Sequence, residues 1–244
     1  MKSIGLYISF FLVAYFQCVT GQISHDTIFV LRWDLVTNQW NQEQYTVNKY
    51  IGNHLSEHAS FYYDTFSGNW VEDKTMYYTY NPQQNLHYKL LKYWDEDMLS
   101  RVNYQKTEYL YTNNLKTSEI VYQYDIVDSS WINLHKREYT YNSENQVNEI
   151  IYYDEWDIYF NQWRPYHLDS FYYKQGELVK WNHYIYDPDQ GWTPERSFVF
   201  SYENDLLTQR SQLQWNDSSG AWVNHWKSEF INENNQRKQW VLNS

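Results

Sequence analysis

Aromatic side chains recur two positions apart in short runs along the chain. Tyr78 and Tyr80 show this spacing, and Tyr139 and Tyr141 repeat it. A spacing of two places both rings on one face of a β-strand, whereas it scatters them around a helix. The runs are also rich in Tyr, Thr, Val and Trp, which favour strands. The pattern therefore predicts extended structure from end to end.

The runs belong to a repeat, and a Trp opens each unit. The anchors are Trp40, Trp70, Trp131, Trp163, Trp192 and Trp222, with Arg101 in the slot between the second and third. Successive anchors lie 29 to 32 residues apart. A Tyr stands ten residues after six of them, at Tyr50, Tyr80, Tyr111, Tyr141, Tyr173 and Tyr202. This regularity indicates tandem structural units.

The second half of each unit is equally regular. A polar segment is followed by an aliphatic residue, at Leu55, Leu86, Leu115, Val147, Leu178 or Leu206. An alternating run then ends in an aromatic residue and an acid or amide, at Trp33-Asp34, Tyr63-Asp64, Trp94-Asp95, Tyr124-Asp125, Tyr153-Asp154, Tyr186-Asp187 and Trp215-Asn216. Two extended runs joined by short polar turns are the signature of a β-hairpin.

The fold that follows is all-β, an antiparallel meander of tandem hairpins with some fourteen strands. Neither face of a typical strand is wholly apolar: on one face of 131–141, Trp131 and Tyr141 flank polar residues such as His135. We therefore expect one long twisted sheet held by cross-strand aromatic pairs, not a two-layer sandwich. Such a strip can coil or curl into an open barrel. No linker divides residues 22–244, which we expect to form a single repeat domain.

Composition and charge narrow the class of protein. The 27 Tyr, 13 Trp and 11 Phe, with only 4 Pro and 7 Gly, argue against disorder. Tyr and Trp have an apolar body and a polar tip, so they suit half-wet sheets. The net charge of -11 excludes nucleic acid and anionic membrane as expected partners, because both require a basic face.

The first 21 residues have the features of a secretory signal peptide. Lys2 supplies the positive start, residues 4–16 are an apolar run too short to span a membrane, and Val19-Thr-Gly21 offers small side chains before a cleavage point. We expect cleavage after Gly21 and a secreted or cell-surface protein with no membrane span in the mature chain. The single cysteine, Cys18, lies in the segment removed, so disulfides and cysteine-ligated metals are not expected.

Clustered acids are the first candidates for catalysis. Asp95-Glu96-Asp97 and Asp154-Glu155-Trp156-Asp157 offer carboxylate pairs of the kind used in glycoside hydrolysis, with Asp154 and Asp157 as the pair to substitute. Both groups occupy the turn position of the repeat, which favours solvated turn acids. The loop Asp187-Pro-Asp-Gln-Gly191 has too few ligands for a Ca²⁺ loop and is interpreted as a turn.

Histidines are the second candidates. His135 and His167 each stand four residues after an anchor, and His183 and His225 lie elsewhere. A metal pair across strands is conceivable, but the units do not share these histidines, so surface polar side chains are the preferred interpretation. No phosphate loop, nucleophile elbow or His-Glu-x-x-His motif is present. We therefore expect no metal, no cofactor, no catalytic residue and no concentration of perturbed groups.

The aromatic rows are the remaining candidates for a binding function, because Trp and Tyr at fixed spacing can stack on sugar rings. The candidate ladder consists of Trp40, Trp70, Tyr80, Trp131, Tyr139, Tyr141, Trp163, Tyr173, Trp192, Tyr202 and Trp222. The alternative is that these side chains only stabilise the sheet, because the hairpin geometry itself requires aromatic residues at these positions. The sequence leaves both interpretations open.

The unit as a whole resembles known repeats. Tyr78-Thr-Tyr80, a polar turn and Leu86, followed by an aromatic-Asp pair, are similar to the Trp/Tyr-Asp tandem β-repeats of proteins exported by Bacteroidota, and more distantly to the Tyr-Asp repeats of Rhs-type shell proteins. The resemblance covers about residues 26–243. It implies a secreted or cell-surface accessory protein with no assigned catalytic residues.

The leading hypothesis is a non-enzymatic exported protein that binds an extracellular glycan or an envelope protein. The alternatives are a structural or adhesive module whose aromatic residues serve packing alone, in which sheet edges could pair with a second copy, and, more remotely, a glycan-degrading enzyme.

Overall fold

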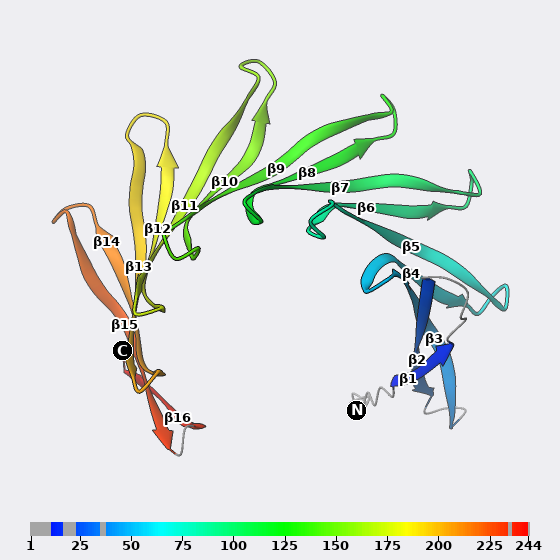
Figure 1. Ribbon diagram of the computed structural model, residues 1–244, viewed down its shortest axis with the longest axis horizontal. Coiled ribbons are helices and arrows are strands. Elements are labelled where there is room, and N and C mark those ends of the chain that lie inside the picture. The colour runs from blue at the N-terminus through cyan, green and yellow to red at the C-terminus, as the bar shows by residue number, and fades with distance from the viewer. Residues whose placement is uncertain (1–10, 17–22, 35–37, 234–235, 244) are drawn as a thin grey trace, which may run out of the picture. The chain divides into compact units, whose positions relative to one another are not determined.

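Strands make up most of the described chain. The computed structural model describes residues 11–16, 23–34, 38–233 and 236–243. These residues contain 16 strands, and each strand is hydrogen-bonded to its neighbours in the order β1 to β16 (Figure 1). The predicted single antiparallel meander is confirmed, with two more strands than the fourteen expected. No helix in the described ranges is long and apolar enough to cross a membrane.

The chain divides into two compact units. The first consists of residues 1–109 and 121–132, and the second of residues 110–120 and 133–244. Strands wholly or mainly in the first unit are β1 (Phe11–Phe16), β2 (Ile23–Asp34), β3 (Gln39–Ile51), β4 (His54–Asp64), β5 (Asn69–Tyr80), β6 (Leu86–Asp95) and β7 (Ser100–Thr112). β1 falls within the predicted signal peptide, whose removal stays a prediction.

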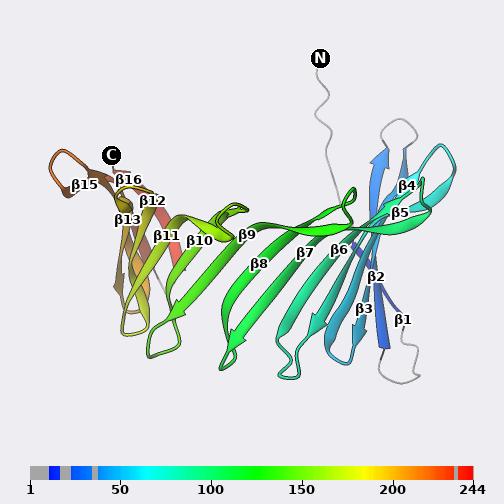
Figure 2. The same cartoon turned by 90° about the horizontal axis from the view of Figure 1, so that it is seen from above.

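The second unit holds most of the remaining strands, while β8 is shared by the two units. The bounds are β8 (Leu115–Asp125), β9 (Ser130–Tyr141), β10 (Val147–Asp157), β11 (Gln162–Lys174), β12 (Glu177–Asp187), β13 (Gly191–Glu203), β14 (Leu206–Asn216), β15 (Ala221–Glu233) and β16 (Gln236–Asn243). Short turns join the strands in both units (Figure 2).

Six turns after even-numbered strands are built on the Asp or Asn that ends the strand. Asp64 Oδ1 accepts a hydrogen bond from the Phe66 amide at 2.9 Å, and Gly68, at φ 70°, donates its amide to the Asp64 carbonyl at 2.8 Å. Equivalent side-chain to amide bonds occur at Asp95, Asp125, Asp157, Asp187 and Asn216. A short polar side chain that bonds the backbone two or three residues ahead is what such a turn needs. The predicted place of Tyr124-Asp125, at the end of a strand and before a turn, is therefore confirmed.

Several turns after odd-numbered strands contain two residues with positive φ. Asn113 and Asn114, Gln175 and Gly176, and Asn204 and Asp205 form such pairs. This backbone matches the right-handed twist of the flanking strands, which explains the choice of Asn, Asp and Gly.

A β-bulge recurs at one place in the repeat. In six pairings of an even-numbered strand with the following odd-numbered strand, the residue three positions after the anchor has no partner in the register. These residues are Glu43, Asp73, Tyr104, Tyr166, Glu195 and His225. A second bulge follows the repeat's aliphatic residue, for example at Ser56 after Leu55. In the last full unit the residue matching Leu178 is Leu207, which pairs with Tyr202, so the predicted position of Leu206 is one residue too early.

The sheet has few fully buried apolar residues. Among the residues whose burial is described, Ala59, Tyr109, Val121 and Phe230 are the buried apolar ones, and the most completely buried side chains are Thr75, Ser60, Ser197 and Ser228. Aromatic side chains are mostly half-buried in cross-strand pairs instead. Cross-strand pairs of this kind contribute roughly 0.2 to 1 kcal/mol each, so the stabilisation is spread along the sheet.

Candidate functional site

The predicted ladder tryptophans form edge-to-face pairs at the ends of strands. Each anchor lies opposite the aromatic residue of the preceding strand, and the ring centroids are 5.0 to 5.3 Å apart in Tyr63–Trp70, Tyr124–Trp131, Trp156–Trp163, Tyr186–Trp192 and Trp215–Trp222. Trp40 is opposite Trp33 in the register and is 39% exposed. In each pair one ring thus covers part of the other, which is the geometry expected of aromatic side chains that stabilise the sheet.

The ladder tyrosines also have structural partners. Tyr80 Oη donates to the Leu55 carbonyl at 3.0 Å, and Tyr141 Oη donates to the Lys116 carbonyl at 2.8 Å. The Lys116 ammonium lies 4.3 Å from the centroid of the Tyr139 ring. Tyr173 and Tyr202 are half-buried, and burial raises the pKa of both. The ladder residues are distributed over both units and are not gathered into one site.

The sequence prediction of the pair Tyr153-Asp154 at the end of its strand is wrong. The turn between β10 and β11 is capped by Asp157, not Asp154, and Trp156 rather than Tyr153 faces the anchor Trp163. Asp154 has no partner in the β10–β11 register, at a second irregularity in this pairing. Asp157 Oδ2 accepts from Arg164 Nη2 at 2.6 Å, while Oδ1 accepts from the turn amides. Because both oxygens of Asp157 are bonded, its role in the structure is that of a turn cap.

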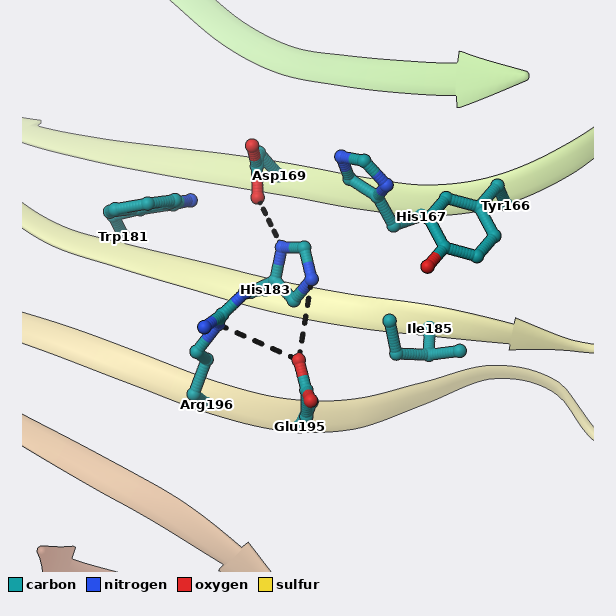
Figure 3. Close-up of a pocket in the computed structure, with 8 residues that line it drawn as sticks. All are labelled: Tyr166, His167, Asp169, Trp181, His183, Ile185, Glu195 and Arg196. Atoms are coloured by element: carbon teal, nitrogen blue, oxygen red, sulfur yellow. Dashed lines mark hydrogen bonds and ion pairs between the residues drawn. The ribbon is translucent and has the colours of Figure 1, made fainter. Parts of the chain in front are cut away.

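A pocket of about 330 Å³ lies on the second unit (Figure 3). Its eight lining residues come from three adjacent strands and are Tyr166, His167 and Asp169 of β11, Trp181, His183 and Ile185 of β12, and Glu195 and Arg196 of β13. Trp181, His183 and Ile185 alternate along β12 and therefore share a face. Asp169 and Arg196 are both opposite His183 in the register, and the bulge at Glu195 adds a second carboxylate next to Arg196.

His183 is held between two carboxylates. Its Nδ1 lies 2.6 Å from Asp169 Oδ1, and its Nε2 lies 3.3 Å from Glu195 Oε2. The side chains of His183 and Asp169 are each 8% exposed, whereas that of Glu195 is 42% exposed. The ring of His167 lies 4.9 Å from that of His183 and stacks on Tyr152 at 3.9 Å between centroids.

The protonation states of the pocket suit ligand donation. Burial raises the pKa of Asp169, but its hydrogen bonds and the neighbouring imidazoles of His183 and His167 together outweigh burial, so the net shift is downward. Burial and the neighbouring His183 lower the pKa of His167. Burial, followed by the charge of Asp169, raises the pKa of Tyr152 to about 12. At neutral pH the pocket therefore offers an ionised carboxylate beside an uncharged imidazole.

Some polar atoms of this pocket are buried without a hydrogen bond. His167 Nδ1, Glu195 Oε2 and Arg196 Nε are in this state with respect to the described residues. Glu195 Oε2 does make ionic contacts, at 3.3 Å to His183 and 3.5 Å to Arg196. Buried polar groups are normally satisfied by protein, water or a ligand, so this pocket has unused capacity to bind a ligand.

A row of stacked rings adjoins the pocket on the same face. Phe171, Trp181 and Phe198 stack across β11, β12 and β13, with centroids 6.2 and 4.7 Å apart. Trp226 of β15 lies 6.4 Å from Phe198, and its Nε1 donates to Gln212 Oε1 at 2.6 Å. This aromatic row therefore extends from the pocket towards β15.

The pocket corrects two expectations. The interpretation of His183 as a surface polar side chain is wrong, because it is 6% exposed and bonded to Asp169. The expectation that no place concentrates perturbed groups is also wrong, since His167, Asp169 and His183 each bring one ligating atom to within 4.8 Å of the others. Trp181, Phe171, Phe198 and Trp226 were likewise absent from the predicted ladder. Only an alignment of neighbouring strands, residue by residue, would have predicted that these four residues stack.

Comparisons with known proteins identify no family. No family model matches the chain, and no curated protein matches it. A protein of unknown function from Bacteroides fragilis has a TM-score of 0.44 at 12% identity, over 51% of this chain and 91% of its own. A DUF3836 family protein from Parabacteroides distasonis has a TM-score of 0.29 at 20% identity, over 35% and 80%.

A TcdB2–TccC3 structure is similar at a TM-score of 0.41 and 11% identity, over 89% of this chain but only 12% of that one. All three TM-scores are below 0.5.

Proposed function

We propose that the protein is an exported, non-enzymatic binding protein, and that the pocket and the aromatic row of the second unit form its surface for a neutral, hydroxyl-rich glycan. The observation that carries the proposal is the adjacency of two kinds of group on one face. Trp181 is both a member of the row and a wall of the pocket that contains His183 and Glu195 (Figure 3).

The chemistry of the two parts is complementary. Sugars present hydroxyl groups, which carboxylates and guanidinium groups bond, and apolar C–H patches, which contact aromatic rings. The pocket supplies Asp169, Glu195 and Arg196, and the row supplies Phe171 and Trp181. The chain's net charge of -11 favours a neutral ligand over an anionic one.

Export and surface location are part of the proposal, and they rest on the N-terminal sequence. Lys2 and the apolar residues that follow are typical of a signal peptide, and the mature protein is proposed to act outside the cell or at its surface.

The test is binding of the purified chain to polysaccharides. Affinity gel electrophoresis with neutral glucans, xylan and mannan should retard the protein, and alginate should not. Trp181→Ala should remove the retardation, whereas Trp131→Ala, which breaks an edge-to-face pair of the first unit, should keep it. Unretarded migration in every gel, or equal retardation of Trp181→Ala and wild type, would overturn the proposal.

A structural or adhesive module is the second candidate, and the ladder geometry favours it. The anchors are engaged in edge-to-face pairs, and Tyr80 and Tyr141 bond backbone carbonyls. In that case no glycan would change the tryptophan fluorescence of the protein, and substitutions such as Trp131→Ala would alter only its stability.

A further inference from the structure

The strongest unassigned cluster is the group of His167, Asp169 and His183 in the pocket of the second unit. One ligating atom from each lies within 4.8 Å of the others. Asp169 and His183 are buried, and His167 is half-buried. Three donors converging from two adjacent strands are held by the sheet register, so they need little reorganisation to act together.

The donor set is that of a transition-metal site. Two imidazoles and one carboxylate, with one position left open, are ligands that Zn²⁺ accepts, whereas Ca²⁺ and Mg²⁺ prefer oxygen donors. A tetrahedral ion with bonds of about 2.0 to 2.1 Å holds its ligand atoms roughly 3.3 Å apart. The present separations, 2.6 Å from Asp169 Oδ1 to His183 Nδ1 and at most 4.8 Å overall, bracket that value.

The surroundings of the cluster contain two further features of a metal site. Metal-bound imidazoles commonly bond a carboxylate through their second nitrogen. His183 has this arrangement, because its Nε2 lies 3.3 Å from Glu195 Oε2 while its Nδ1 faces Asp169. In addition, the buried Nδ1 of His167 has no hydrogen-bond partner among the described residues. An unbonded lone pair or N–H at this depth is an independent sign that a ligand is accommodated there.

We propose that His167, Asp169 and His183 bind one divalent transition-metal ion, with Glu195 positioning the His183 ring. The ion takes the position of the hydrogen bond between His183 Nδ1 and Asp169 Oδ1, and the imidazole proton is then on Nε2, where it can be donated to Glu195. The two ligand atoms move apart by less than an ångström, on the order of the difference between 2.6 Å and a tetrahedral ligand separation. The metal site shares Asp169 and Glu195 with the proposed glycan surface, but it does not require that a glycan binds there.

The chain offers a matched control. His135 occupies the same position in its unit as His167, four residues after the anchor, and is also half-buried. It is not part of the cluster. Asp169→Asn is nearly isosteric and keeps an oxygen that can accept from His183, so it weakens the site with the least disturbance of the fold.

The experiment is isothermal titration of the chelator-treated full chain with Zn²⁺, and in parallel with Mg²⁺. Wild type and His135→Gln should each bind one Zn²⁺ at this site, and neither should bind Mg²⁺ there. His167→Gln and Asp169→Asn should bind Zn²⁺ at least about tenfold more weakly, and Glu195→Gln about tenfold more weakly. Equal Zn²⁺ affinity in wild type and Asp169→Asn, or the same loss in His135→Gln, would overturn the proposal.

A second measurement avoids any doubt about folding of the variants. In the wild-type protein, Zn²⁺ should shift the imidazole NMR signals of His167 and His183 and leave that of His135 in place. Unshifted signals of His167 and His183 would count against the site. Glycan retardation is measured with chelator present, so its outcome is separate from that of metal binding.

Discussion

Tyr141 reaches back 25 residues to bond the backbone carbonyl of Lys116, and its phenol oxygen lies 2.8 Å from that carbonyl oxygen. Tyr80 makes the same bond to Leu55, again 25 residues earlier. In these two units the Tyr that closes an odd strand thus ties its hairpin to the hairpin before it. The bond accounts for the Tyr ten residues after the anchor at these two positions.

We expect Tyr141→Phe to lower the free energy of unfolding. The substitution removes one neutral hydrogen bond and leaves the ring in place, which costs about 1 kcal/mol. Urea unfolding should show a lower midpoint with an unchanged slope. Tyr173 holds the same repeat position and makes no such bond to any described residue, so Tyr173→Phe should be close to neutral. An equal loss in both variants would contradict this role for the phenol of Tyr141.

Arg101 occupies the repeat position at which the other units have Trp. Replacing it by Trp should nevertheless destabilise the protein. Arg101 Nε lies 2.6 Å from Glu72 Oε1, and Nη2 lies 3.1 Å from Oε2. The Glu72 side chain is 12% exposed, so Arg101→Trp would leave a nearly buried carboxylate without its cation. The cost should be about 1 to 2 kcal/mol, reduced from a fully buried pair because the guanidinium is partly exposed.

The double variant Arg101→Trp with Glu72→Gln is the control for this prediction. It removes the stranded charge and lets the new indole pair with Trp94, which is opposite position 101 in the register. We expect it to recover much of the lost stability in thermal or urea unfolding. A single variant Arg101→Trp that is more stable than wild type would show that the ion pair contributes nothing.

Alkaline pH should weaken the first unit through Tyr122. Burial, and then hydrogen bonding to Glu108 Oε2 at 3.0 Å, raises the pKa of Tyr122 to about 12 from its ordinary value of 10.0. The fold therefore favours the protonated phenol. Its contribution to stability is complete below pH 10 and is lost as the pH rises through the folded pKa near 12.

The measurement is the urea midpoint between pH 9 and pH 12, with tyrosinate followed by its ultraviolet absorbance. Tyr122→Phe should flatten the alkaline loss of stability. Tyr159→Phe, which alters a turn residue that is 88% exposed, should follow the wild-type curve. Parallel curves for Tyr122→Phe and wild type would refute the assignment.

Apolar residues at the turn tips should be dispensable for stability. Phe66 is 99% exposed and Val127 is 86% exposed, both in turns of the first unit. Phe66→Ser and Val127→Ser should change the unfolding free energy by less than about 0.5 kcal/mol. They should, however, reduce self-association in analytical ultracentrifugation, because exposed apolar side chains promote it. Val121→Ala is the matched control: Val121 is 4% exposed, and the loss should be about 2 kcal/mol.

The spacing of aromatic and polar residues along the sequence predicts most of the fold. Trp131, Tyr139 and Tyr141 lie on one strand with Asp125 as the cap of the preceding turn, as their periodicity requires. Each anchor Trp pairs with the aromatic residue near the end of the preceding strand, because the turns between the two strands are nearly constant in length. Where the sequence offers two aspartates near one turn, Asp154 and Asp157, composition alone does not distinguish them, and the prediction of Asp154 is wrong.

The pocket could not be found in the same way, because it depends on a bulge. Next to the turn, Tyr173 pairs with Leu178, and an unbulged ladder would place Asp169 opposite Asn182. The extra residue Val179 shifts the register by one, so Asp169 is opposite His183 instead. A shift of one residue moves a side chain to the other face of the sheet. The contact between Asp169 and His183 is thus decided by one unpaired residue that has no distinctive side chain.

The bulge three residues after each anchor is a position at which the side chain varies between units. The unpaired position carries Glu43, Asp73, Tyr104, Tyr166, Glu195 and His225 in six of the strand pairings. An acid, a phenol or an imidazole is tolerated there because the ladder has no direct partner to match. Each unit therefore provides one interchangeable position on a constant scaffold, and new chemistry can be acquired in one hairpin while the others keep the sheet intact.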